Sequence, residues 1–430
     1  MSSIKVIVVG CGIAGTVVAI MLKLKGYEPV IYERGARSPD AGLSLMLQLN
    51  GLRILSLIPG LVEQLPGMPI EQAMLYSVVP SDIRLLGQSN FPADLRSEFG
   101  YGLVGVRRPN FLTLLTDTAI AHGIDVHFER QVVDVEQIDD SVRVRLNTGE
   151  TDTASFVIGC DGLHSNVRQA LFGKENATFT GLTQTGGISP NPAAFGDMKP
   201  SMFNFYGDGL HVIAYPISET RLSWALTRRE PEAKETWHPL DEAARDEVRN
   251  GPLSQIPHQE NVFPQKHFPD AFGAGDLVRN AEKITKYGLY DRPELKSWHK
   301  GRVVLIGDAA HPTSPHLGQG ANQAFEDVYH LIRLLMKHYP KPSDPNGPST
   351  AVLETIFTEL EALRIERTAA LVQGARKMGE RRVVNGEELA LARNDAVAAE
   401  WLDGEAILLG MKKTLGAEEW EGWGGLENNL

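Results

Sequence analysis

The chain has 430 residues, of which 42% are hydrophobic and 22% are charged. That length exceeds a single ordinary core of roughly 100–200 residues, so we expect two domains, and the apolar content excludes a disordered chain. The 54 acidic and 42 basic residues leave a net charge of −12, which argues against a protein that grips nucleic acid. With only two cysteines, Cys11 and Cys160, a disulfide scaffold is excluded and a reducing, cytoplasmic compartment is expected.

The chain opens on an apolar stretch, residues 6–22, which is too short for a typical membrane span and holds three glycines. We interpret it as a buried strand over residues 4–9, a glycine turn and a helix over residues 16–25. A second strand over residues 29–33 completes a βαβ unit. No membrane span is expected here or elsewhere in the sequence.

The rest of the chain changes in character along its length. Residues 126–146 hold short alternating strands. Residues 178–284 read as a second, antiparallel domain because Pro and Gly separate short alternating strands there. Within it, residues 231–269 read as an irregular polar insertion. The other expected elements are a helix over 109–121, buried strands over 155–160 and 303–307, long helices over 319–338 and 351–378, and a helix and tail over the last fifty residues.

The first motif that carries chemistry consists of Gly10, Gly12 and Gly15, with Glu33 at the end of the second strand. Gly10 permits a tight turn, Gly12 lets the backbone approach a pyrophosphate, and Gly15 allows close packing of helix and strand. The helix N-terminus offers free N–H groups to phosphates, and Glu33 can accept hydrogen bonds from a ribose diol. The motif predicts a dinucleotide site but does not separate NAD from FAD.

Two later motifs follow buried strands. Asp161 opens a turn into a helix, where it either serves a ligand or bonds the local backbone beside a Ser165 cap. Asp308 ends a strand at the carboxyl edge of the sheet, where a carboxylate can bond a ligand hydroxyl. The next helix begins with a glycine-rich run whose bare amides would stabilise negative charge, such as that of a reduced flavin ring. That run includes Gly318, Gly320, Ala321 and Asn322.

These motifs carry a family resemblance. Residues 10–15, 159–168 and 307–322, in this order, resemble the class A flavoprotein monooxygenases, the single-component hydroxylases of the para-hydroxybenzoate and salicylate hydroxylase type. Arg108, at the start of a helix, is similar to a family arginine that contacts the flavin nucleotide, and Gly42 lies where the family places a loop against the flavin. The resemblance spans roughly residues 4–340.

The resemblance implies an α/β fold: a Rossmann-like FAD-binding domain of the glutathione-reductase type with a β-meander, a smaller antiparallel-sheet substrate domain and a C-terminal helical segment. The implied boundaries are residues 1–70, 101–177 and 285–340 for the FAD-binding domain, 71–100 and 178–284 for the substrate domain, and 351–430 for the C-terminal helices and tail. The implied FAD-binding residues are Gly10, Gly12, Gly15, Glu33, Gly42, Arg108, Asp161, Asp308, Gly318, Gly320, Ala321 and Asn322.

It also implies an activity. NAD(P)H would reduce FAD, O2 would form a flavin C4a-hydroperoxide, and one oxygen atom would enter a small aromatic, typically phenolic, substrate. Loss of a carboxylate, the choice of NADH or NADPH, and a monomeric or homodimeric state are left open. The alternatives are an epoxidase or Baeyer–Villiger-like oxygenase of the same fold, and a flavin reductase or dehydrogenase that does not use O2.

Two residues of the antiparallel domain are candidates for substrate contact. Alternation along a strand places His211 and Tyr215 on one face. His211 could take a phenolic proton because an imidazole titrates near neutrality, and Tyr215 could hold a substrate oxygen. Alternatively, neighbouring backbone satisfies both side chains.

One position departs from the family pattern. Many fungal relatives carry a catalytic arginine where this chain has Gly186, so the substrate is either neutral or anchored elsewhere. His311 and His316 lie near Asp308, but no third ligand is evident, and no metal site is expected.

Overall fold

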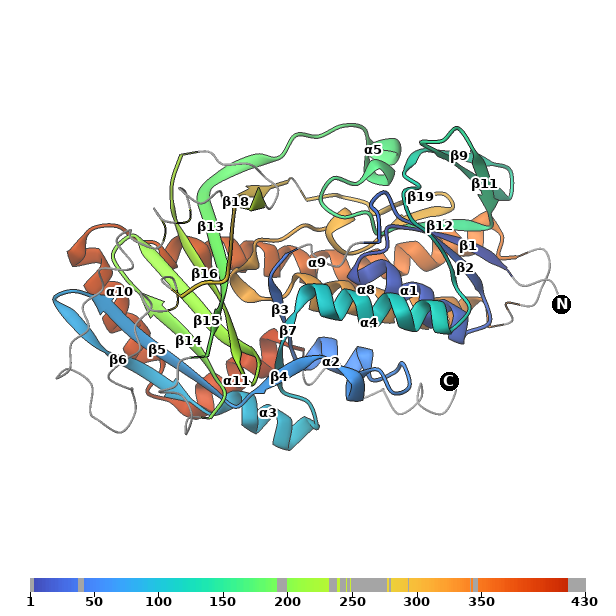
Figure 1. The fold of residues 1–430 in the computed structure, drawn as a ribbon. Helices are drawn as coiled ribbons and strands as arrows, with labels where there is room; N and C mark the ends of the chain where they lie inside the picture. Colours follow the sequence, from blue (N-terminus) through green and yellow to red (C-terminus); the bar gives the residue numbers. More distant parts are fainter. Residues whose placement is uncertain are drawn as a thin grey trace.

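In the computed structural model of the protein (Figure 1), the described residues are 4–37, 42–191, 199–231, 238–239, 280–292, 294–340 and 347–416, with a few isolated positions between these ranges. The polar insertion expected at residues 231–269 lies almost entirely outside the described residues.

A six-stranded sheet forms the core of the first half. Its order is β19 (His299–Lys300), β20 (Val303–Leu305), β12 (Phe156–Gly159), β1 (Lys5–Val9), β2 (Glu28–Tyr32) and β8 (Asp125–His127). All pairs are parallel except that of β19 with β20. The sequence grouped β8 with the neighbouring short strands, but β8 pairs with β2 at the sheet edge. Its half-exposed position explains its polar alternation.

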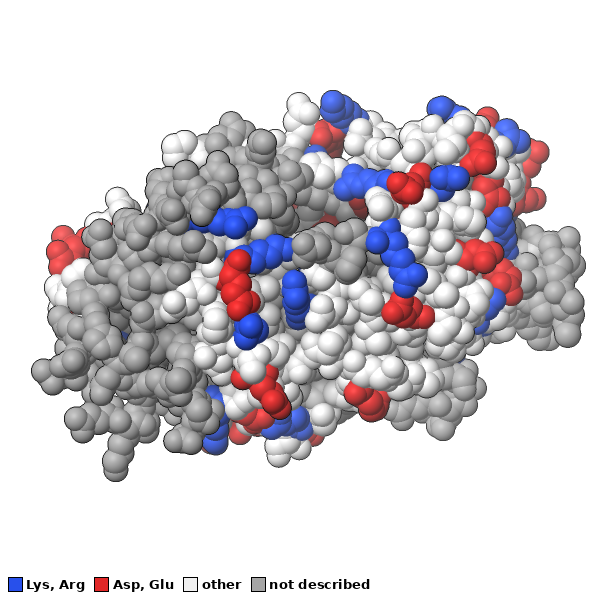
Figure 2. All heavy atoms as spheres, viewed as in Figure 1, with Lys and Arg blue, Asp and Glu red and all other residues white. Residues whose placement is uncertain are grey.

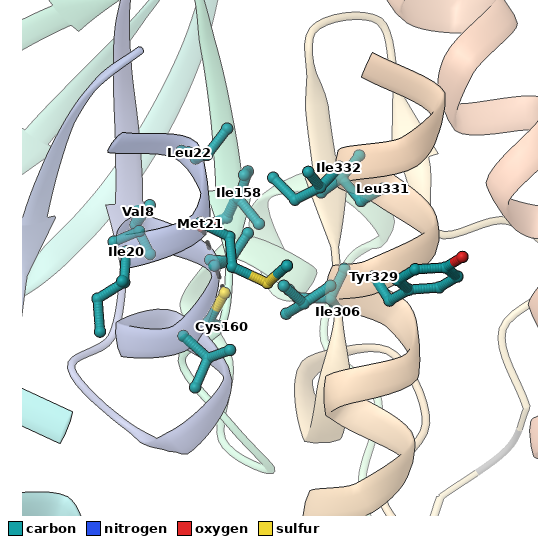
Figure 3. Close-up of a cluster of buried hydrophobic side chains, with 14 of the residues drawn as sticks. Val8, Ile20, Met21, Leu22, Ile158, Cys160, Ile306, Tyr329, Leu331 and Ile332 are labelled. Carbon is teal, nitrogen blue, oxygen red and sulfur yellow. Dashed lines mark hydrogen bonds between the residues drawn. The ribbon is translucent and has the colours of Figure 1, made fainter. Parts of the chain in front are cut away.

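Helices cover this sheet: α1 (Ile13–Leu24), α4 (Arg108–Ala121), α8 (Gly320–His338) and α9 (Thr350–Arg382). Figure 3 shows how Val8, Met21, Ile158 and Leu331 bring β1, α1, β12 and α8 into one apolar cluster. All four side chains are at most 2% exposed. This packing fixes the ends of the strands and helices at which ligands bind in such folds.

Two small sheets and several short elements complete this half. One sheet holds β9 (Val132–Ile138), β10 (Ser141–Leu146) and β11 (Thr151–Ala154), and the other holds β3 (Ser44–Leu47), β7 (Leu103–Arg107) and β4 (Gly67–Ile70). The short helices are α2 (Leu49–Leu55), α3 (Phe91–Phe99), α5 (Asn166–Phe172), η1 (Val62–Gln64), η4 (Gly307–Ala309) and η5 (Pro315–Leu317).

An eight-stranded sheet forms the second half. Its order is β17 (His238–Pro239), β18 (Lys283–Asp291), β13 (Thr178–Pro190), β16 (Arg221–Arg229), β15 (Leu210–Ser218), β14 (Ser201–Tyr206), β5 (Gln72–Val79) and β6 (Asp82–Ser89). The sequence predicted antiparallel pairing throughout, but β14 and β5 run parallel. More than a hundred residues of intervening chain separate them, so no tight turn imposes antiparallel pairing.

This sheet has two different faces. One face is apolar and contributes Phe205, Trp224 and Ile284 to a buried cluster. The register places polar side chains on the other face: Gln184 opposite Thr227, and Tyr215 opposite Ser223. That second face meets the first half of the molecule, since the Tyr215 hydroxyl bonds Ser44 of β3.

The C-terminal part consists of three helices. Helix α9 runs lengthwise from the first half to the large sheet, where α10 (Glu387–Glu400) packs on β5 and β6 and α11 (Gly404–Thr414) packs on α3. The sequence predicted one helix and a tail beyond α9, and the structure describes two helices there. Among the described residues, no helix is both long and apolar enough to cross a membrane. On the described part of the face in Figure 2, basic and acidic side chains are interspersed.

Candidate functional site

The turn between β1 and α1 is built on glycine. Gly10 has φ +104°, and an added Cβ would lie 2.6 Å from the Cys160 carbonyl oxygen. A Cβ on Gly15 would lie 1.9 Å from the Gly10 oxygen, whereas a Cβ on Gly12 would have no neighbour within 4 Å. Gly10 and Gly15 are therefore required by packing, and Gly12 leaves open space at the N-terminus of α1. That space fits a phosphate group.

Glu33 lies beside this turn. One carboxylate oxygen accepts from the Cys11 N–H at 2.8 Å and the other from the Gly35 N–H at 2.7 Å. A carboxylate has about four acceptor positions, so Glu33 retains capacity for the hydroxyls of a ribose. Its fixed orientation suits that role.

A second group of predicted residues meets at the start of α8. Arg108 approaches Gly42 closely, since an added Cβ there would lie 3.0 Å from the arginine Cδ. Asp308 lies beside Gly320, where an added Cβ would be 4.0 Å from a carboxylate oxygen of Asp308. Asp308 is exposed, yet the protein around it raises the pKa of its carboxyl by desolvation, against the opposing effects of His311 and Arg108. An accessible side chain at such depth lies at the bottom of a cleft. Arg108 and Asp308 thus lie close enough for their opposite charges to interact, and their contact with a cofactor stays a prediction.

The loop before α8 holds backbone groups toward the same cleft. Gly318 has φ +64°, and α8 has no side-chain cap. Gly318, Gly320 and Ala321 are partly exposed, whereas Asn322 is fully buried. The Asn322 amide donates to the carbonyls of Gly318 (2.8 Å) and Met46 (3.1 Å) and accepts from the Gln48 N–H (3.0 Å). Asn322 therefore positions the loop, and its side chain does not face the cleft.

A buried ionic network supports this loop. Asp327 accepts from the Gly307 N–H at 2.9 Å and bonds His311 at 2.6 Å. Its other oxygen accepts from Arg364 Nε at 2.8 Å, and Arg364 also pairs with Glu326. Burial alone would raise the pKa of Asp327, but the nearby His311 and Arg364 lower it to about 2. The network joins α8 and α9 to the strand end that carries Asp308.

Asp161 contacts its own helix. Its carboxylate accepts from the N–H groups of Asn166 (2.7 Å) and Val167 (3.2 Å) and from the Ser165 hydroxyl (2.5 Å). Ser165 in turn caps α5. The structure thus shows the local arrangement that the sequence left open as one of two interpretations, and a cofactor contact by Asp161 stays a prediction.

Tyr215 begins a chain of hydroxyl groups. Its hydroxyl lies 2.7 Å from Ser44, Ser44 donates to Ser223 at 2.7 Å, and Ser223 donates to the Gly187 carbonyl at 3.4 Å. A serine hydroxyl has one proton, and Ser44 already donates its proton to Ser223. In the bond between Tyr215 and Ser44, Tyr215 is therefore the donor. Desolvation raises the pKa of Tyr215 to about 12, so the phenol stays protonated and keeps its lone pairs as acceptors.

His211 lies on the same sheet face, only 1% exposed, with its ring edge-to-face against Tyr206. Burial lowers the pKa of His211 well below its usual range, and the Arg382, His316 and Arg393 charges lower it further. The prediction of a base at His211 assumed titration near neutrality, and this assumption is wrong here. Nε2 of His211 is buried without a hydrogen-bond partner among the described residues, and a substrate contact by His211 stays a prediction.

Several residues of the site escaped the sequence reasoning. Ser44 and Gln48 follow the Gly42 loop without a motif of their own, and Arg364 and Arg382 lie on a helix with no glycine signature. Only Asp327, which follows shortly after the glycine-rich run that ends at Asn322, lies close enough to a motif to give a usable signal. A cavity of about 250 Å³ lies beside the cleft, between α9 and the ends of β13 and β18.

Comparisons with known proteins show the family and the fold of this chain. A family described as "FAD binding domain" matches residues 3–346. The 3-amino-4-hydroxybenzoate 2-monooxygenase of Streptomyces cremeus is 30% identical over 385 residues, which cover 88% of this chain and 87% of that protein. The 6-hydroxynicotinate 3-monooxygenase of Bordetella bronchiseptica is 27% identical over 335 residues, covering 77% and 82%. The crystal structure of Klebsiella pneumoniae HpxO with FAD and uric acid matches with a TM-score of 0.77 at 23% identity, over 96% of each chain. The predicted fold class is confirmed.

Proposed function

Since this chain belongs to the FAD-binding-domain family and is a single-component FAD-dependent monooxygenase, we propose that its substrate is a small hydroxylated aromatic molecule bound against Tyr215. Bound FAD supplies the redox chemistry, in which NAD(P)H is oxidised and one oxygen atom of O2 enters the substrate. The protein holds the cofactor, orients the aromatic ring of the substrate and excludes water from the site.

The cofactor-binding residues divide by the part of FAD that each fits. Gly12 and the N-terminus of α1 fit the pyrophosphate, and Glu33 fits a ribose. The amides at Gly318, Gly320 and Ala321 fit the electron-rich edge of the flavin ring because a helix N-terminus favours negative charge. Arg108 and Asp308 fit the polar groups between these parts.

The observation that carries the substrate proposal is the hydroxyl chain that begins at Tyr215. Tyr215 donates its own proton to Ser44, so the lone pairs of its oxygen can accept a further hydrogen bond. A phenolic O–H of the substrate donates to this oxygen. Ser44, the next member, belongs to the strand that follows the Gly42 loop. In this proposal, the hydrogen-bonded hydroxyl groups hold the substrate hydroxyl at the end of the sheet face that lies beside the Gly42 loop and the flavin. His211 contacts the substrate farther along the strand as a neutral group.

The relatives support a hydroxylated ring. Their names specify 3-amino-4-hydroxybenzoate and 6-hydroxynicotinate, both of them aromatic rings with a hydroxyl group.

The test measures NAD(P)H oxidation by the purified FAD-loaded enzyme in air, with a panel of phenols, aminophenols and their O-methyl ethers, and with H2O2 assayed in parallel. We expect one phenol to accelerate oxidation many-fold, to yield little H2O2 and to gain one oxygen atom, whereas its methyl ether fails to do so. Acceleration only by alkenes or ketones would instead establish an epoxidase or a Baeyer–Villiger oxygenase. Equal activity with the phenol and its ether would overturn the role of Tyr215.

A further inference from the structure

The C-terminus of α9 brings a buried guanidinium to the polar face of the large sheet. One terminal nitrogen of Arg382 donates to the His316 carbonyl at 2.8 Å, and the group also bonds Tyr206. Its Nε is buried and has no hydrogen-bond partner. Arg382 remains partly accessible although desolvation lowers its pKa, as expected for a side chain that lines an internal cleft.

Most of the buried arginines that the structure describes pair with a carboxylate, whereas Arg382 does not. Arg364 is paired with Glu326 and Asp327. Arg393 directs its donors at the Asn394 side chain and at three backbone carbonyls. Among the described residues, no carboxylate forms an ion pair with Arg382. A buried charge without a counter-ion is costly, and an anionic ligand would remove that cost.

Two further polar atoms on this sheet face lack partners. Nε2 of His211 and Oδ1 of Asn204 are buried and make no hydrogen bond. Tyr206 pairs with His211, and Asn204 pairs with Ile213, in the same register of β14 and β15, so all of these side chains lie on one sheet face. Tyr206 and His211 thus lie with Arg382 at one end of that face, and Asn204 lies one row nearer its centre.

On β13, β16 and β15, the centre of the face carries no polar side chain. Gly186, Ala225 and Ile213 lie side by side across three strands, and they separate the His211 end from the Tyr215 end. Four residues of strand span about 13 Å. A para-substituted ring with a hydrogen bond of about 2.8 Å at each end has a similar length.

We propose that Arg382 binds a carboxylate on the aromatic substrate, at the end of the ring opposite the hydroxyl held by Tyr215. His211 supplies a second hydrogen bond to that carboxylate. The inference rests on the proposed function and extends it, because it makes the substrate an aromatic hydroxy acid. It also accounts for Gly186: the positive charge that many relatives carry on this strand comes here from the end of α9, and the glycine leaves room for the ring.

The experiment compares matched pairs of acid and amide, 4-hydroxybenzoate with 4-hydroxybenzamide and 3-amino-4-hydroxybenzoate with its amide. Binding to the FAD-loaded enzyme is followed by the change in flavin absorbance, and turnover by steady-state kinetics. We expect the wild type to prefer the acid. In Arg382→Gln, the affinity for the acid should fall by about 30- to 1000-fold, as expected when one member of a buried charge pair is removed, while the affinity for the amide changes little. Arg382→Lys keeps the positive charge but loses the planar guanidinium, so its affinity for the acid should lie between those of the wild type and Arg382→Gln.

Arg381→Gln is the matched control, since Arg381 precedes Arg382 on α9 and pairs with Glu400 at the surface. It should bind acid and amide as the wild type does. Equal affinity of the wild type for acid and amide, or an equal loss for both in Arg382→Gln, overturns the carboxylate site. If Arg382→Gln does not fold, the acid preference of the wild type and the Arg382→Lys series decide the question. Turnover of neutral phenols without acid preference overturns only this inference, whereas no turnover of any aromatic overturns the proposed function.

Discussion

Gly12→Ala is expected to weaken FAD binding strongly and leave the fold intact, whereas Gly15→Ala, three residues later, should damage both. The contrast follows from what a Cβ would meet. At Gly12 it enters open space, and the backbone there has φ −84°, which any residue adopts. At Gly15 it would lie 1.9 Å from the Gly10 oxygen.

The magnitudes follow from the geometry. Alanine in place of glycine at the N-cap costs less than about 1 kcal/mol of folding free energy. If the new methyl displaces the pyrophosphate from two backbone N–H groups, each charge-assisted bond contributes about 1.5–3 kcal/mol, and the FAD Kd rises by roughly 10²- to 10⁴-fold. For Gly15→Ala, the new Cβ would lie under 3.0 Å from a backbone atom, a contact that proteins essentially never show. Helix α1 or the turn must therefore move by about 1 Å, which costs about 1–3 kcal/mol or more.

The assay uses FAD-free protein for stability and FAD titration for affinity. Thermal unfolding followed by circular dichroism should give Gly12→Ala a Tm within a few degrees of the wild type and Gly15→Ala a clearly lower one. FAD affinity, measured by quenching of flavin fluorescence, should fall in both variants. Unchanged FAD affinity in Gly12→Ala would refute the placement of the pyrophosphate against this residue.

Three further outcomes follow from the site. Arg364→Met leaves the buried carboxylates of Glu326 and Asp327 without their shared cation, so urea unfolding should show a loss of about 3–5 kcal/mol; a loss under 1 kcal/mol would contradict the role of the network. The pKa of Asp327 is lowered from 3.8 to about 2, so its stabilisation is complete above pH 3.8 and disappears as the pH falls toward 2. Unfolding free energies of Asp327→Asn should therefore vary less with pH across this window than those of the wild type, and parallel curves would speak against the shift. Tyr215→Phe removes one acceptor of the substrate hydroxyl, so kcat/KM for the phenol should fall about three- to tenfold, with more H2O2 per NAD(P)H. Ser44→Ala, which leaves the phenol of Tyr215 in place, should have a smaller effect on both readings.

The glycine turn and Glu33 could be placed from the sequence because their chemistry is local. The spacing of Gly10, Gly12 and Gly15 within one strand–turn–helix unit determines which of them meets backbone and which meets open space. The same holds for the start of α8. Sequence reasoning could not decide whether Asn322 turns its side chain to the cleft, because that depends on Gln48, which lies 274 residues earlier.

The substrate face depends on contacts between distant segments. Tyr215 is polarised by Ser44, which is 171 residues away in the sequence, and no spacing rule connects them. Alternation correctly puts His211 and Tyr215 on one face, but it carries no information on depth or on neighbouring charge. The pKa of His211 is low because it is buried beside Arg382, a residue that the sequence placed beyond the substrate domain.

The position of Arg382 depends on several contacts that fasten the end of α9 to the hairpin of β14 and β15. The Gly209 N–H donates to the Val384 carbonyl at 2.8 Å, and Arg393 donates to the carbonyls of both Arg382 and Gly207. The other side of Arg382 bonds the His316 carbonyl, in the loop that leads to the start of α8. One guanidinium thus joins the large sheet to the loop before α8. A flexible surface arginine would lose side-chain entropy on binding an anion, whereas this one is already held in place, so the carboxylate of a substrate would gain nearly the full strength of the contact.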